Sequence, residues 1–227
     1  MRRIILFDID GTLVSGGPAK DSFCDAMVET YGTLGAARGV TFAGKTDPQI
    51  ARELLDGTGM DSEEIERGFE ELWERYLGYL EARLPDMPVQ VLPGVVEVLD
   101  ALAEHEDVGV GLLTGNIIGG ARLKLGSGGL WERFSFGSYG SDREERNELP
   151  AIAVGRARQL WGEVLSAEDA IVVGDTPKDV ACGKVGGTRT LAVATGHFSF
   201  EDLMVTGADH VLNDMSSTHA VVTLLTE

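Results

Sequence analysis

Short, uninterrupted apolar runs recur along this chain and predict buried strands. The first, residues 4–7, reads Ile-Ile-Leu-Phe without the alternation of a half-exposed strand, which is typical of a strand covered on both faces of a parallel sheet. Similar runs follow at residues 108–113, 171–173, 191–193 and 211–212. Helical patterns lie between them at residues 93–104 and 149–161, the first with Pro93 in its opening turn. The alternation predicts an α/β fold with a doubly wound, mostly parallel sheet.

Polar clusters follow two of these runs directly. Thr114-Gly115-Asn116 ends one, and Gly174-Asp175-Thr176 ends another. Functional groups of doubly wound sheets collect at the carboxyl ends of the strands. We therefore expect both clusters to lie at one site.

Residues 16–90 interrupt the alternation with several helices. Gly16-Gly17-Pro18 breaks the chain after the first strand, and Asp47 is expected to cap a helix whose first residue is Pro48. Ser62 is a candidate N-cap for the longest helix, which carries one apolar stripe: Ile65, Phe69, Leu72, Trp73, Tyr76 and Leu80. We expect residues 1–15 and 91–227 to form the α/β core domain and residues 16–90 to form a smaller all-α domain.

The net charge and the cysteine content limit the classes of partner and the cellular location that we expect. Nineteen basic and 37 acidic residues give a formal charge of −18, which repels polyanions and argues against a nucleic-acid partner. An anionic substrate would then need a local positive charge or a metal. Cys24 and Cys182 lack metal-type spacing, and no apolar stretch is long enough to span a membrane. We expect a cytoplasmic monomer or homodimer with no membrane partner.

Two aspartates follow the first strand at the closest spacing that puts them on one face. Residues two apart in an extended chain point the same way, so Asp8 and Asp10 should converge while Ile9 packs oppositely. Their mutual repulsion is relieved by a hard divalent cation, and Mg²⁺ is commonly held by one or two carboxylates together with substrate phosphate. The alternative is that the pair ends a strand and caps a turn before Gly11.

Three stretches carry a resemblance to a known family. They are Asp8-Ile9-Asp10-Gly11-Thr12-Leu13-Val14, Leu112-Leu113-Thr114-Gly115-Asn116 and Gly174-Asp175-Thr176-Pro177-Lys178-Asp179. Together they resemble the first, second and fourth motifs of the haloacid dehalogenase-like superfamily, in its phosphatase branch. The resemblance implies a Rossmann-like core, a helical cap inserted after the first motif, and a Mg²⁺-dependent phosphomonoesterase acting on a small phosphorylated metabolite.

The resemblance also assigns roles. Asp8 would be the nucleophile that forms an aspartyl-phosphate, and Asp10 the general acid and base, for which its pKa would have to be raised. Thr114 would hold the phosphoryl oxygens, with substrate contacts from Gly11, Thr12, Gly115 and Asn116. Mg²⁺ would be held by Asp8, the backbone carbonyl of Asp10, and Asp175, while Asp179 would act through water or only cap a helix.

The third motif departs from the family pattern. The resemblance requires a lysine ahead of the helix that precedes the fourth motif, but residues 142–150 contain only arginines as cations. Arg146 is the first candidate, because a guanidinium binds phosphate oxygens through paired hydrogen bonds, and Arg143 and Lys124 are the other two.

The predicted cap bears on the substrate. Phe42-Ala43-Gly44-Lys45-Thr46-Asp47 resembles the cap segment of phosphoglycolate phosphatase-like members, in which Lys45 and Thr46 would face the leaving group. A phosphosugar mutase of the beta-phosphoglucomutase type, or a sugar-phosphate phosphatase, is the main alternative. A phosphonate hydrolase and a non-catalytic phospho-switch are more distant ones.

Overall fold

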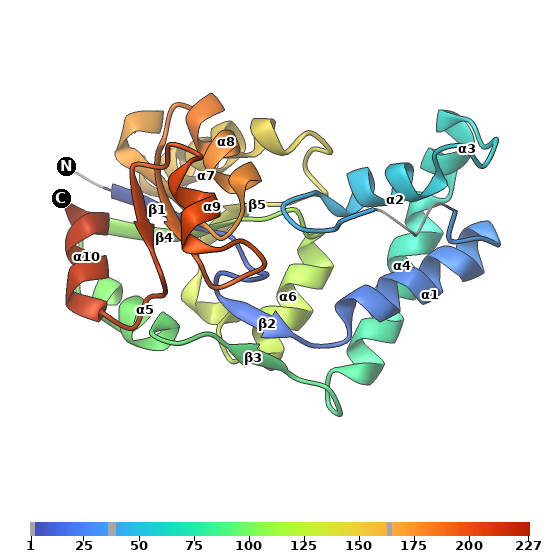
Figure 1. Ribbon diagram of the computed structural model, residues 1–227, viewed down its shortest axis with the longest axis horizontal. Coiled ribbons are helices and arrows are strands. Elements are labelled where there is room, and N and C mark those ends of the chain that lie inside the picture. Colours follow the sequence, from blue (N-terminus) through green and yellow to red (C-terminus); the bar gives the residue numbers. More distant parts are fainter. Residues whose placement is uncertain (1–2, 36–39, 163–164) are drawn as a thin grey trace.

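Strand β1 (Arg3–Phe7) runs through the middle of a six-stranded sheet in the computed structural model, which describes residues 3–35, 40–162 and 165–227 (Figure 1). All neighbouring strands are parallel, in the order β5-β4-β1-β6-β7-β8. Their bounds are β4 (Val108–Leu113), β5 (Phe136–Ser138), β6 (Ala170–Gly174), β7 (Arg189–Val193) and β8 (His210–Leu212). The predicted α/β fold is confirmed.

The two faces of β1 contribute to two apolar cores, as expected for a strand buried on both sides. Ile5 and Phe7 belong to the larger core, and Ile4 and Leu6 to the smaller. On the larger side pack α5 (Val95–Ala103), α6 (Ile118–Ser127) and α10 (Thr218–Thr226); on the other pack α7 (Leu149–Trp161) and α8 (Pro177–Val185). The remaining elements of the core are α9 (Phe200–Met204) and three short 3₁₀ turns, Trp131–Arg133, Arg146–Glu148 and Ala167–Asp169.

Four helices stand apart from the sheet, at the right of Figure 1: α1 (Ala19–Tyr31), α2 (Asp47–Leu55), α3 (Ser62–Arg67) and α4 (Phe69–Arg83). The chain enters this group through β2 (Val14–Gly16) and leaves it through β3 (Val89–Val91), which pair antiparallel. Aromatic side chains hold the group together, with the Phe23 ring centroid 5.5 Å from Tyr76 and 5.7 Å from Phe42, both edge to face.

The helix boundaries in this region differ from those predicted. The stripe from Ile65 to Leu80 belongs to two helices, α3 and α4, which meet at Gly68. Asp61, rather than Ser62, caps α3 in a capping box with Glu64.

The start of α2 is also displaced by one residue. Thr46, rather than Asp47, is its N-cap, and the Thr46 hydroxyl accepts a hydrogen bond from the Gln49 amide. Asp47 is therefore the first helical residue, followed by Pro48.

The structure also shows the state of the two cysteines and the length of the helices. Cys24 and Cys182 are both free thiols, and Cys182 is fully buried. Among the residues that the structure describes, no helix combines the length and apolar character needed to cross a bilayer.

Candidate active site

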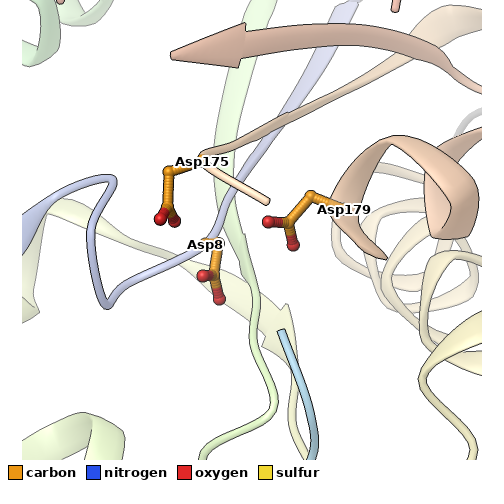
Figure 2. Close-up of side chains that lie close together, drawn as sticks. All are labelled: Asp8, Asp175 and Asp179. Atoms are coloured by element: carbon orange, nitrogen blue, oxygen red, sulfur yellow. The ribbon is translucent and has the colours of Figure 1, made fainter. Parts of the chain in front are cut away.

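Three buried carboxylates meet where β1, β6 and α8 come together. Asp8 follows the last residue of β1, Asp175 follows β6, and Asp179 lies in the first turn of α8. Figure 2 shows the three side chains around a common space, and one oxygen from each lies within 4.8 Å of the others. The parallel sheet produces this arrangement, because the carboxyl ends of β1 and β6 meet at the same edge.

The cluster has the donor set of a hard-cation site. Burial raises the pKa of Asp8 to about 7 and that of Asp175 to about 9, and the neighbouring carboxylates add to both shifts. Protonation is favoured because it removes a charge that is both desolvated and close to like charges. A divalent cation bound to these oxygens would remove the same repulsion. All the ligand atoms are carboxylate oxygens, the type that Mg²⁺ prefers.

Gly11 lets the loop after β1 close onto Asp175. Its φ is +87°, and a Cβ at this position would lie 2.3 Å from Asp175 Oδ2, so any side chain would displace the carboxylate. The neighbouring Thr12 hydroxyl is buried and donates to Asp175 Oδ1 at 3.2 Å. Gly11 lines the cavity beside the cluster, but Thr12 does not. The Thr12 hydroxyl therefore orients an acid, and its expected contact with substrate stays a prediction.

Arg146 is the cation that reaches the three-acid cluster. Its Nη2 lies 3.1 Å from Asp8 Oδ1 and 2.5 Å from Asp179 Oδ1, and the whole side chain is buried. Desolvation opposes its charge, but Asp179 and Asp8 together raise the pKa of Arg146 above its ordinary value. Of the other two candidates, Arg143 pairs with Glu148 at the surface and Lys124 contacts Asp10.

Asp179 caps α8, which was one of the two expected alternatives, and it also contacts Arg146, which was not expected. Its Oδ2 accepts hydrogen bonds from the backbone amide and the hydroxyl of Thr176, which completes the capping box of α8. Its Oδ1 accepts from Arg146. Asp179 therefore caps the helix and also ties Arg146 to the acidic cluster.

Asp10 faces the same cavity as Asp8 but has different partners. Lys124 Nζ lies 2.9 and 2.8 Å from its two oxygens, and Asn116 Nδ2 donates to Oδ2 at 2.8 Å. Burial would raise the pKa of Asp10, but Lys124 and Asn116 outweigh it, so that the pKa is below the ordinary value. The raised pKa expected for this residue is therefore wrong for the structure as it stands.

The end of β4 supplies further lining residues on the same side of the cavity as β1 and β6. Thr114 is buried, and its hydroxyl accepts hydrogen bonds from the Asn116 amide and side chain. A Cβ on Gly115 would lie 2.0 Å from the carbonyl oxygen of Lys45, so this loop touches the segment before α2 directly. All three expected residues, Thr114, Gly115 and Asn116, line the cavity.

The cavity has a volume of about 390 Å³ and lies between the strand ends and the helices α1, α2 and α4. Lys45 lines it, but its ammonium group pairs with Glu53 of α2. Thr46 does not line it: the side chain caps α2 and donates to the Glu144 carbonyl at 2.7 Å. Thr46 therefore joins the helical segment to the core, and its expected position at the leaving group stays a prediction.

Asp47 is a cavity residue that the sequence analysis missed. Its Oδ2 accepts from the Ile117 amide at 2.8 Å, and burial raises the pKa of Asp47 to about 6 although Lys124 and the Ile117 hydrogen bond oppose the shift. The sequence showed only an acidic residue before a proline at a helix start. In the structure its neighbours Thr46 and Pro48 are buried too, but no signal in the local sequence indicated this.

The arrangement can bring a nucleophile, a proton carrier and a cation site to one reacting group. Asp8 lies beside Arg146 and the acidic cluster, while Asp10 is held separately by Lys124. Thr114 and Asn116 add neutral polar groups between them. Such a set suits attack on a compact anion at a site from which much of the water is excluded.

Comparison with known proteins identifies similar proteins and a family. Phosphoglycolate phosphatase 1 of Pseudomonas aeruginosa is 27% identical over 86% of this chain and 70% of its own length. The phosphoglycolate phosphatase of Rhodospirillum rubrum is 28% identical over 96% of this chain and 89% of its own. A crystal structure of a hydrolase from Pseudomonas syringae superposes with a TM-score of 0.71 at 20% identity, covering all of both chains, and supports the fold. The model of the haloacid dehalogenase-like hydrolases matches residues 5–193, and the chain belongs to this family.

Proposed function

We propose that this chain is a Mg²⁺-dependent phosphomonoesterase that acts on a small phosphorylated metabolite through an aspartyl-phosphate on Asp8. The observation that carries the proposal is the placement of Asp8 between Arg146 and a cluster of two further buried acids, with Asp10 facing the same cavity. The family and the names of the two phosphatase relatives support the same reaction class.

The first half of the reaction transfers the phosphoryl group to the enzyme. A carboxylate oxygen of Asp8 attacks phosphorus, and the bond from phosphorus to the ester oxygen breaks. Arg146 places its positive charge beside the attacking oxygen, which lowers the repulsion between two anions. The departing alkoxide takes a proton from Asp10 and leaves as the alcohol.

The second half returns the enzyme to its starting state. Asp10, now a carboxylate, takes a proton from a water molecule, and the oxygen of that water attacks phosphorus. The bond to Asp8 breaks, and inorganic phosphate is released. Covalent catalysis of this kind divides one difficult step into two easier ones.

The metal would be held by Asp8, Asp175 and Asp179, together with the backbone carbonyl of Asp10. When bound, Mg²⁺ supplies Lewis-acid polarisation of the phosphoryl oxygens and neutralises their charge. The positions of Thr12 and Thr176 fit this assignment, because their hydroxyls orient Asp175 and Asp179.

The protonation state of Asp10 depends on what shares the cavity. With Lys124 and Asn116 as its partners, Asp10 is a carboxylate at neutral pH and is ready for the proton-accepting half of the cycle. A phosphate dianion arriving beside it would raise its pKa again, because a like charge disfavours ionisation. The same side chain can then serve both halves.

The helices α1–α4 are proposed to form a cap over the site. The division into a core of residues 1–15 and 91–227 and a cap of residues 16–90 is supported by the β2–β3 pair, through which the chain enters and leaves the helices. We also propose a cytoplasmic location, which fits the two free thiols.

The substrate class follows from the relatives. Phosphoglycolate is the first candidate, because both curated relatives described above are named for it. A phosphosugar mutase would use the same two aspartates but return the phosphoryl group to sugar, and the release of inorganic phosphate separates the two reactions.

The test is a panel of small phosphomonoesters with added Mg²⁺, scored by phosphate release. We expect turnover of at least one member, phosphoglycolate first. The Asp8→Asn variant should lose activity by about 10³-fold or more, as nucleophile replacements do, while keeping its melting temperature. Full turnover by Asp8→Asn would contradict the assignment of the nucleophile, and a panel without any turnover would contradict the function.

A further inference from the structure

Lys124 lies outside the motif segments that the family resemblance identified, yet it lines the cavity. It belongs to α6, eight residues after Asn116 and on the side of the helix that packs against the site. Side chains in a helix point toward its N-terminus, and the N-terminus of α6 follows the end of β4. Lys124 therefore reaches back along the helix to the carboxyl edge of the sheet.

The donors of Lys124 are used within one small network. Its Nζ contacts both oxygens of Asp10, at 2.9 and 2.8 Å, and Asn116 Oδ1 at 2.6 Å. Asn116 in turn donates to Asp10 Oδ2 and to the Thr114 hydroxyl, both at 2.8 Å. The Asp10 carboxylate is consequently held by two side chains from the β4–α6 segment.

The exposure of the two partners is unequal. Only 6% of the Lys124 side chain is exposed, whereas 50% of the Asp10 side chain is exposed toward the cavity. Burial of the ammonium carries a desolvation penalty, which its contact with the Asp10 carboxyl group offsets. The lysine is therefore buried, while the Asp10 carboxyl group is accessible from the cavity.

The two cations of the site serve different acids. Arg146 contacts Asp8 and Asp179, and Lys124 contacts Asp10. Asp47 is the other carboxylate close enough to influence Lys124, and its hydrogen bond goes to the Ile117 amide.

We propose that Lys124 is a positioning residue that holds the carboxyl group of Asp10 where it meets the leaving-group oxygen, separately from the cation that serves the nucleophile. The inference rests on the proposed phosphatase function and adds a residue to it. Lys124 does not touch the phosphoryl group in this role. Its loss should therefore matter in proportion to how much the leaving group needs a proton.

The experiment compares kcat/KM for two kinds of phosphomonoester. One is 4-nitrophenyl phosphate, whose phenolate leaves without protonation, and the other is the best alkyl ester of the substrate panel. The ratio kcat/KM covers the steps up to loss of the alcohol, so the later hydrolysis does not obscure the result. Lys124→Met is expected to lower kcat/KM for the alkyl ester by about 10²-fold and that for the aryl ester by less than about threefold, since general acids contribute about 10²- to 10⁴-fold.

Arg122→Met is the matched control. Arg122 lies two residues away on α6, is exposed and lines a separate surface cavity, so its replacement removes the same charge from the same helix without touching Asp10. Both substrates should be turned over at the unaltered rate. Asn116→Ala removes the second tether of Asp10 and should give a selective loss of the same kind, which keeps the inference testable if Lys124→Met does not fold.

Equal losses on both substrates would overturn the inference, because they would make Lys124 a general electrostatic or structural group. An unaltered alkyl rate would overturn it as well. Failure of the proposed function looks different, because the unmodified protein would then turn over neither ester.

Discussion

The two walls of the cavity are built in different ways. On the core wall, acids and cations at the ends of β1, β4 and β6 hold one another through short polar contacts, as the Arg146–Asp8 and Lys124–Asp10 pairs show. On the cap wall, apolar side chains dominate, including Phe23, Phe42 and Ile50, and the Lys45 ammonium pairs with Glu53. Ion pairs and hydrogen bonds hold side chains in one geometry, whereas apolar contacts are not directional and accept side chains of other shapes. The difference supports our proposal that the core carries the chemistry and that the proposed cap selects the alcohol.

The largest effect is expected from a change on the core wall, at the cluster of Asp8, Asp175 and Asp179. Asp175→Asn removes one carboxylate from the site proposed for Mg²⁺ and should weaken activation by Mg²⁺ by about 10²-fold or more, because even the outer partners of metal ligands are worth about 10- to 100-fold. The measurement is a Mg²⁺ titration of phosphatase activity. Asp86→Asn, at an exposed aspartate of the chain segment after α4, is the control. An unchanged midpoint for Asp175→Asn would remove this residue from the metal site.

A smaller effect follows from the pH dependence of the same cluster. The pKa of Asp8 is raised from 3.8 to about 7 in the folded protein, and that of Asp175 is raised further. The folded state then binds more protons than the unfolded state, so the metal-free protein should lose stability as the pH rises from about 4 through 7 and beyond. Each kcal/mol lost lowers the melting temperature by about 2 to 4 °C for a chain of this size.

Thermal melts across this pH range, in chelator and in Mg²⁺, measure the effect. Mg²⁺ binds the ionised carboxylates, so its stabilisation should grow as the pH rises. Asp175→Asn should show a flatter profile in chelator, since one member of the repelling group is neutral. A melting temperature in chelator that rises between pH 5 and 8 would contradict the prediction that the metal-free protein loses stability as the pH rises.

The smallest effect is expected on the cap wall. Phe42→Ala removes a half-buried ring that packs edge to face on Phe23 and lines the cavity. Apolar contacts of this size discriminate between substrates by about 10-fold, so the relative kcat/KM values of the alkyl esters should change by that order. The kcat for 4-nitrophenyl phosphate should stay near that of the unmodified protein. A uniform collapse of all activities would show that the two walls do not act separately.

The sequence predicted the core wall far better than the cap. Strands β1, β4, β6, β7 and β8 are dense apolar runs, and polar groups directly after three of them were enough to locate the site. Strand β5 was missed because Phe136-Gly137-Ser138 has neither an apolar run nor alternation. Its place at the sheet edge comes from pairing with β4, which local sequence does not encode.

Long-range pairing explains the other differences. Lys124 and Asp10 are 114 residues apart, and their contact depends on the rotation of α6 about its axis. Thr46 and Thr12 were expected at the substrate because of their motif segments, but each hydroxyl is used within the protein. Asp47 was assigned only to a helix start, since nothing in the local sequence shows that the Ile117 amide would be its partner.

The β2–β3 pair has a consequence for how such proteins diversify. Ser15 lies opposite Gln90, so the two points where the chain leaves and rejoins the sheet region are neighbours in space. Everything between them could be exchanged as one cassette by a single recombination event, without altering the spacing of the strands. A lineage could exchange this segment as a unit, provided that the new segment keeps the contacts that Lys45, Thr46 and Asp47 make with the core.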